Sequence, residues 1–116
     1  MKIRIKGNSL RYRLTKRDVE QFSKEGYLEE ITNFGGPCLI YALQRGGDDG
    51  LKASFNNNKI LLTIPVAMAI EWAQTERVGF EGQDNDLFLL IEKDFKCLDN
   101  VAEDQSDNYP NPQAFR

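Results

Sequence analysis

Five positively charged side chains near the N-terminus are the first candidates for chemistry in this sequence. Residues 2–6 and 10–14 each alternate between apolar and polar side chains, which is typical of half-buried β-strands. Gly7 and Asn8 stand between them as a two-residue hairpin signal. The alternation places five cations on one face of this basic hairpin, namely Lys2, Arg4, Lys6, Arg11 and Arg13.

Two interpretations of the basic hairpin are open. In the simpler one, the face is solvated or is paired within the domain, and the candidate partners are Glu29, Glu30, Glu81, Glu92 and Asp94. In the other, the face is an anion-binding site, because arginine presents forked donors that fit phosphate oxygens. Nucleic acid is a weaker candidate, since the one aromatic residue of the hairpin, Tyr12, falls on the opposite face.

Carboxylates are the second candidates for chemistry. Glu92 and Asp94 stand two residues apart in an extended stretch, so both lie on one side of it and could share one Mg²⁺. The sequence contains no histidine, which removes imidazole acid–base catalysis and histidine-activated nucleophiles. We expect no cofactor, and Mg²⁺ would enter only if the protein were a hydrolase.

The composition indicates one globular domain. Of its 116 residues, 41% are hydrophobic and 28% are charged. No apolar run reaches the length of a membrane span and no export signal is visible, so we expect a cytoplasmic protein without membrane contact. Cys38 and Cys97 lack the spacing of a redox motif, and we expect reduced thiols.

The charge of the chain is unevenly distributed. Residues 1–17 carry seven Lys or Arg and no acid, whereas the net charge of the whole chain is −3. This asymmetry indicates either an anionic partner or pairing between the two ends of the chain.

The elements that must position these side chains occur twice in the same order. After the basic hairpin, Thr15 and Asp18 predict a capped helix over about 16–25, followed by strands over 27–32 and 38–44. Beyond the loop 45–50 come strands over 51–55 and 59–64, a helix that begins at Pro65, and strands over 78–81 and 87–91. We therefore predict an α+β domain, residues 1–98, built from an internally duplicated ββαββ unit in residues 1–44 and 51–95. The sheet is expected to be mainly antiparallel, as facing sheets or a half-barrel with two helices.

The same periodicity predicts the core. In the second helix, Val66, Ile70 and Ala73 share one apolar face, and Met68 and Trp72 form the neighbouring one. Trp72 should be at least half covered. The other residues expected to be mostly buried are Ile3, Ile5, Leu14, Phe22, Leu39, Tyr41, Ile64, Ile70, Leu89 and Ile91.

Residues 99–116 are acidic, polar and interrupted by proline, and they cannot form a core of their own. We predict an extended C-terminal tail that docks through Tyr109 and Phe115, either across the domain or across a second copy in a homodimer. Its acids Glu103, Asp104 and Asp107 would complement the basic hairpin.

Several stretches resemble an uncharacterised family of small bacterial proteins over essentially the whole chain. They are residues 1–14, Ile91–Phe95 with the following Cys97 and Leu98, and the terminal residues 109–112. This resemblance implies no activity. In fold pattern alone the sequence is also similar to the triphosphate-tunnel phosphohydrolases, whose first strand reads Glu-x-Glu-x-Lys. Here that strand reads Lys2-x-Arg4-x-Lys6, so the metal-binding glutamates are absent and phosphate binding is what the likeness leaves open.

These observations favour a non-catalytic interaction or ligand-binding module, whose partner is a protein or a phosphate-containing small molecule. The alternative is a phosphate-ester binding protein or hydrolase that uses the basic hairpin with Glu92 and Asp94. An enclosed basic cavity would favour the alternative, and a basic face paired to carboxylates would favour the module.

Overall fold

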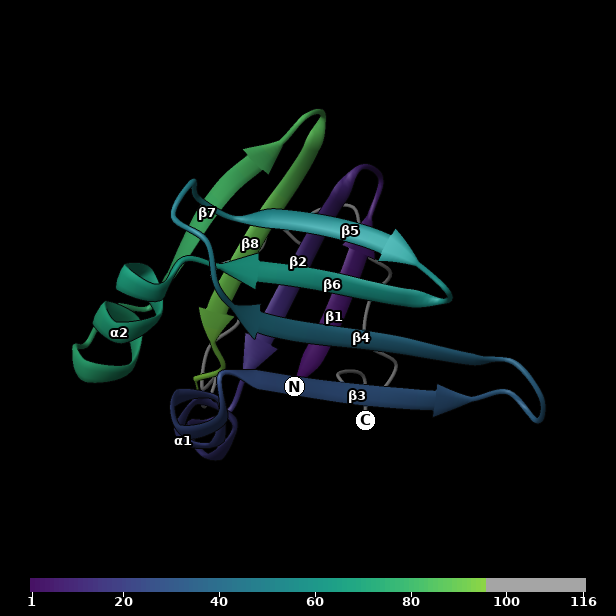
Figure 1. The fold of residues 1–116 in the computed structure, drawn as a ribbon, viewed down its shortest axis with the longest axis horizontal. Coiled ribbons are helices and arrows are strands. Elements are labelled where there is room, and N and C mark those ends of the chain that lie inside the picture. The colour runs from purple at the N-terminus through teal and green to yellow at the C-terminus, as the bar shows by residue number, and fades with distance from the viewer. Residues whose placement is uncertain (96–116) are drawn as a thin grey trace, which may run out of the picture.

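The computed structural model describes residues 1–95, which form two four-stranded sheets that face each other and two helices (Figure 1). The α+β prediction with two helices is thereby confirmed. The predicted tail, its anchors Tyr109 and Phe115, and Cys97 lie outside the described residues. The elements are β1 (Lys2–Lys6), β2 (Ser9–Leu14), α1 (Lys16–Glu25), β3 (Tyr27–Asn33), β4 (Cys38–Arg45), β5 (Lys52–Asn56), β6 (Lys59–Ile64), α2 (Val66–Gln74), β7 (Gly79–Asp84) and β8 (Leu87–Lys93).

Each sheet takes one hairpin from each half of the chain. The first sheet has the strand order β1-β2-β8-β7 and the second has the order β3-β4-β6-β5. Within each hairpin the strands are antiparallel, but the central pairs, β2 with β8 and β4 with β6, are parallel. Parallel strands cannot be joined by a tight turn, and here the two partners come from different halves of the chain. The sequence did not predict these central pairs.

Strand pairing in the two halves follows one pattern. Lys2 pairs with Arg13 in the first half, and Lys52 pairs with Thr63 at the corresponding positions of the second. The hydrogen bond from the Arg45 amide to the Gly26 carbonyl likewise has a counterpart from Lys93 to Val78. This agreement is what a repeat predicts. The internal duplication itself, in residues 1–44 and 51–95, stays a prediction.

Helix α1 begins and ends where the sequence indicates. The Thr15 side chain accepts a hydrogen bond from the Asp18 amide, and the Asp18 carboxylate accepts one from the Thr15 amide, which forms a capping box. Gly26 takes a left-handed conformation after the last turn and donates its amide to the Phe22 carbonyl. Val19 and Phe22 form its buried stripe, as predicted.

In helix α2 the predicted covering of Trp72 is confirmed and the predicted burial of Ile70 is wrong. Ala69 and Trp72 are buried, whereas Val66 and Ile70 are each 46% exposed. The helix is apolar on several sides, so periodicity alone does not select one. The indole decides the orientation, because Trp72 is completely buried and donates its Nε1–H to the Val78 carbonyl at 2.9 Å.

The core lies between the two sheets and beneath the helices. Of the predicted core residues, Leu14, Phe22, Ile64, Leu89 and Ile91 are buried, and Ile3, Leu39 and Tyr41 are partly buried. The predicted burial of Ile5 is wrong, because its side chain is 60% exposed. Alternation places it correctly on the inner side of β1, but it lies beside the hairpin turn, where the facing sheet does not cover it. No helix within residues 1–95 is long and apolar enough to cross a membrane.

Candidate functional site

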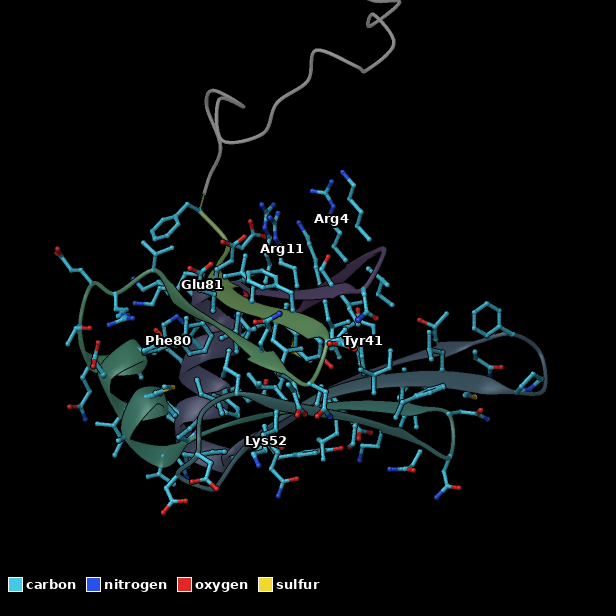
Figure 2. The ribbon with its side chains drawn as sticks, turned by 90° about the horizontal axis from the view of Figure 1, so that it is seen from above. Arg4, Arg11, Tyr41, Lys52, Phe80 and Glu81 are labelled. Atoms are coloured by element: carbon cyan, nitrogen blue, oxygen red, sulfur yellow. The ribbon has the colours of Figure 1, made fainter. Side chains whose placement is uncertain are left out.

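The basic hairpin forms part of the outer face of the first sheet. Lys2, Arg4 and Lys6 alternate along β1, and Arg11 and Arg13 alternate along β2. In the antiparallel register Lys2 lies opposite Arg13 and Arg4 lies opposite Arg11. Figure 2 shows Arg4 and Arg11 pointing away from the second sheet. The structure therefore brings the five predicted cations together on one surface, which we call the basic face.

Carboxylates from the end of β8 reach this basic face. Arg13 lies beside Glu92 in the parallel register and donates its Nε–H to Oε1 at 2.7 Å. The Arg11 Nε is 3.7 Å from the same oxygen, and the Lys2 Nζ is 3.2 Å from Asp94 Oδ2. Glu92 and Asp94 thus offset part of the charge, as the simpler interpretation expects.

The other candidate partners lie elsewhere. Glu29 is 3.8 Å from Lys59 on the second sheet, and Glu30 binds the N-terminal ammonium. Glu81 lies on the same outer face as Arg4 and Arg11 (Figure 2), but Leu90 on β8 separates it from Arg11 in the strand register. Of the five candidate partners, which all lie in residues 1–95, Glu92 and Asp94 are the two that form ion pairs with the basic face.

The metal site predicted at Glu92 and Asp94 stays a prediction. Both carboxylates contact cations of the basic face, and a bound Mg²⁺ would have to displace them. Within residues 1–95 no group of three or more acidic, histidine or cysteine residues is close enough to hold a metal ion. The hollow between the basic side chains has a volume of only about 140 Å³ and lies on an outer face, lined by Lys2, Ile3, Arg4, Arg11 and Arg13.

A larger hollow, which the sequence analysis missed, lies between the two sheets. It is an apolar groove of about 450 Å³, and Ser54 is the only polar residue among the residues up to 95 that line it. Residues at corresponding positions of the two halves line it in pairs: Ile5 with Phe55, Leu10 with Ile60, and Leu39 with Leu87, together with Ala53 and Ser54. The signal in the sequence was alternation, which marks all of these side chains except Ser54 as inward-facing but does not show that the sheets leave them uncovered.

The crossing of the two sheets explains why the groove exists. Both helices lie at one side of the sandwich, where β2 and β6 end (Figure 1). The opposite ends of these strands carry tight turns, at Gly7–Asn8 and at Asn57–Asn58, and no helix of the described residues covers them. Gly7, Asn57 and Asn58 all have positive φ, which lets two residues reverse the chain. The inner side chains beside these turns remain open to solvent.

A polar cluster joins β1 to β3 at one edge of the sandwich. The N-terminal ammonium lies 2.8 Å from Asp18 Oδ2 and 2.9 Å from Glu30 Oε2, and the Tyr41 hydroxyl donates to the Met1 carbonyl at 3.0 Å. Burial disfavours the charged form of the ammonium. The hydrogen bonds to Asp18 and Glu30 and the negative charges of these two residues outweigh this effect, so the pKa of the ammonium is raised. Burial also opposes ionised Asp18, but bonds from the ammonium and from Thr15 outweigh it, so its pKa is lowered.

Removing the Asp18 charge should make stability depend less on pH. Near neutral pH, Asp18→Asn should lower the free energy of unfolding by up to about 1 kcal/mol, the usual range for partly exposed ion pairs. The lowered pKa of Asp18 means that its contribution is lost as pH falls through the folded-state value. The raised pKa of the ammonium means that its contribution is lost as pH rises through the folded-state value. The two proteins should therefore differ most between about pH 4 and pH 8.

Urea unfolding at a series of pH values measures this difference. Asparagine keeps the side-chain oxygen of the capping box, so the charge is the main group lost. Glu20→Gln removes the same charge from the same helix and serves as the matched control. A loss in Asp18→Asn that stays constant from acidic to alkaline pH would contradict a role for the ion pairs.

The fold and the surface features define a small two-sheet α+β protein with an apolar groove and a separate basic face. The chain belongs to a family of unknown function, DUF7009, whose sequence profile matches residues 1–113. The predicted resemblance to an uncharacterised family is thereby confirmed. No curated protein and no solved structure matches the chain, so the likeness to the triphosphate-tunnel phosphohydrolases has no support.

Proposed function

We propose that this protein is a non-catalytic binding module that holds the apolar part of a small ligand in the groove between its two sheets. The observation that carries the proposal is the groove of about 450 Å³ with its almost wholly apolar lining. Sites for small molecules commonly occupy about 300–1,000 Å³, are mainly hydrophobic, and often lie at the mouth of a β-barrel or between packed elements.

The volume and the apolar lining of the groove favour a small ligand over a flat protein surface. Leu10 is buried at its base, whereas Ile5 and Phe55 stand at corresponding positions of the two halves and are 60% and 66% exposed. A ligand can therefore contact buried carbon atoms and be flanked by two large side chains. Within the described part of the chain no charged residue lines the groove, so we place any charged group of the ligand outside it.

The hydrolase alternative gains less support from the geometry. The basic side chains line a small hollow of about 140 Å³ on an outer face, and the nearby Glu92 and Asp94 are held in ion pairs. We also propose the cytoplasm as the compartment, which agrees with the free thiol of Cys38.

Titration with the neutral fluorescent probe N-phenyl-1-naphthylamine tests the groove. The wild-type protein should bind it saturably with one site per chain. Ile5→Glu places a charge beside the ligand and should weaken binding by about tenfold or more. Ile31→Glu is the matched control, because Ile31 is 57% exposed on another edge strand and does not line the groove. It should change the affinity by less than about twofold.

A second pair of variants tests whether the probe binds in the groove or to any exposed apolar side chain. Phe55 and Phe34 are equally exposed, at 66%, but only Phe55 is among the residues that line the groove. Phe55→Glu should therefore weaken probe binding and Phe34→Glu should not. Equal losses in both pairs would overturn the proposal. A wild-type chain that dimerises in sedimentation, with the dimer abolished by Ile5→Glu and no probe bound, would show instead that a second copy fills the groove.

A further inference from the structure

The outer edge of β1 borders the apolar groove. β1 is the last strand on its side of the first sheet, and within residues 1–95 no strand pairs with its outer edge. Lys6 and Ser9 close a two-residue turn and therefore form a hydrogen-bonded pair, and such pairs alternate with unbonded ones along antiparallel strands. The amide and carbonyl groups of Ile3 and Ile5 consequently point away from β2. This edge thus presents two donors and two acceptors in one line.

The corresponding edge in the second half of the chain is closed by a side chain. Ala53 on β5 corresponds to Ile3 on β1, and its amide donates to Asp84 Oδ2 at 3.0 Å. This bond agrees with backbone groups that point away from the hairpin partner at these positions. Within residues 1–95 no side chain caps the Ile3 amide in this way. Of these two edges, only that of β1 is open in the described part of the chain.

A strand added to β1 would cover the groove. Ile5 lines the groove from β1, and Leu39 and Ile60 line it from the facing sheet. The β3–β4 hairpin continues past β1 before it turns back, so the second sheet extends beyond the β1 edge (Figure 1). Because side chains alternate along a strand, every second side chain of an added strand would point toward the groove. The 60% exposed Ile5 would then be covered.

Charge indicates which partner fits this edge. The outward side chains of β1 are Lys2, Arg4 and Lys6. A second copy that paired antiparallel through β1 would place basic side chains opposite basic ones, which destabilises a sheet. A strand with an acidic residue across from the exposed Lys6 would place opposite charges together instead. Lys2 already pairs with Asp94, so Lys6 is the main determinant of the preferred charge.

We propose that β1 pairs with a short extended peptide in which apolar residues alternate with acidic or neutral polar ones. This proposal rests on the proposed function of the groove and names the ligand whose apolar part enters it. Two apolar side chains, opposite Ile3 and Ile5, point toward the groove, and an acidic residue lies across from Lys6. The peptide main chain bonds to the open amide and carbonyl groups of β1. Strand addition of this kind gains affinity from the main chain and specificity from alternate side chains.

Calorimetric titration of the full chain with the blocked peptide acetyl-Glu-Ile-Thr-Ile-Glu-amide tests the proposal. One equivalent should bind, and it should displace N-phenyl-1-naphthylamine from the groove. Methylation of both isoleucine amide nitrogens removes the donors that face β1 and keeps the side chains, so the affinity should fall by about tenfold or more. Methylation of the threonine nitrogen, which faces away from β1, is the matched control and should change the affinity by less than about threefold.

A charge reversal at Lys6 gives a readout of opposite sign. Lys6→Glu should weaken binding of the acidic peptide severalfold, and it should tighten binding of acetyl-Lys-Ile-Thr-Ile-Lys-amide by a similar factor. Lys52→Glu makes the same charge change at an exposed position of β5 and should alter either affinity by less than about twofold. Urea unfolding of both variants would show that the fold is kept.

The outcomes separate this proposal from the function on which it rests. A protein that binds the naphthylamine probe but not the acidic peptide would overturn the peptide proposal and leave the function of the groove standing, whereas failure of both ligands would overturn both. Equal losses on methylation of the isoleucine and threonine nitrogens, or peptide binding that does not displace the probe, would also overturn the peptide proposal. A chain that is dimeric in sedimentation and binds no peptide would assign the β1 edge to a second copy instead.

Discussion

Replacing Trp72 by alanine should lower the free energy of unfolding by about 3–5 kcal/mol. The side chain is completely buried between α2 and the sheets, so truncation leaves a large cavity in the core. It also leaves the Val78 carbonyl without the Nε1–H that now bonds to it at 2.9 Å. Urea unfolding followed by circular dichroism measures the loss, since the variant removes the single tryptophan of the chain.

Two further variants of α2 separate the effect of losing buried side-chain volume from the effect of losing the hydrogen bond. Ile70→Ala removes a side chain that is 46% exposed and should cost less than about 1 kcal/mol. Trp72→Phe keeps most of the buried area but no donor, so its loss should fall between those of the two alanine variants. Equal losses at positions 70 and 72 would show that α2 does not pack as described.

The Gly79→Ala substitution should lower the free energy of unfolding by about 3 kcal/mol or more, which is at least as much as a typical substitution that overpacks a core. Gly79 begins β7 and pairs with Glu92 on β8. A β-carbon at this position would overlap the Ile91 carbonyl oxygen and approach the Glu92 α-carbon to 2.8 Å. Both are backbone atoms, so the β7–β8 pair would have to separate locally.

Gly82→Ala is the matched control on the same strand. There an added β-carbon would meet the Leu51 side chain at 3.7 Å, which is ordinary contact distance. The control should change stability by less than about 1 kcal/mol, because alanine also reduces the entropy of the unfolded chain. Thermal melts of the two variants give the comparison. A tolerated Gly79→Ala would mean that β7 and β8 do not approach each other as closely as described.

Local sequence signals predicted most elements of the fold. The Gly7–Asn8 turn, the Thr15–Asp18 capping box and the Gly26 helix end all act within a few residues, so the sequence displays them directly. The parallel central pairs could not be predicted in the same way, because they join strands from different halves of the chain. The exposure of Ile5 depends on what lies opposite it, which that same long-range pairing decides, and the exposure of Ile70 follows from the burial of Trp72 on the same helix.

The two candidate sites differ in the same way, because local sequence predicted the basic face and did not predict the groove. Alternation along β1 and β2 was sufficient to place five cations on one face, because that arrangement depends on one hairpin. The groove depends on the angle at which two sheets cross and on which end the helices cover (Figure 1). Its lining residues come from β1, β2, β4, β5, β6 and β8, and no local pattern in the sequence relates them.

Each sheet combines one hairpin from each half of the chain, and this arrangement affects how the chain folds while it is being synthesised. When the first half has left the ribosome, β2 and β4 each have one hairpin partner and one open edge. The strands that close those edges, β8 and β6, come from the second half, and Leu89 must pair with Leu10 across most of the described sequence. Such distant pairing slows folding and leaves strand edges free to join another nascent chain. The first half alone therefore exposes one edge of β2 until β8 is made and one edge of β4 until β6 is made.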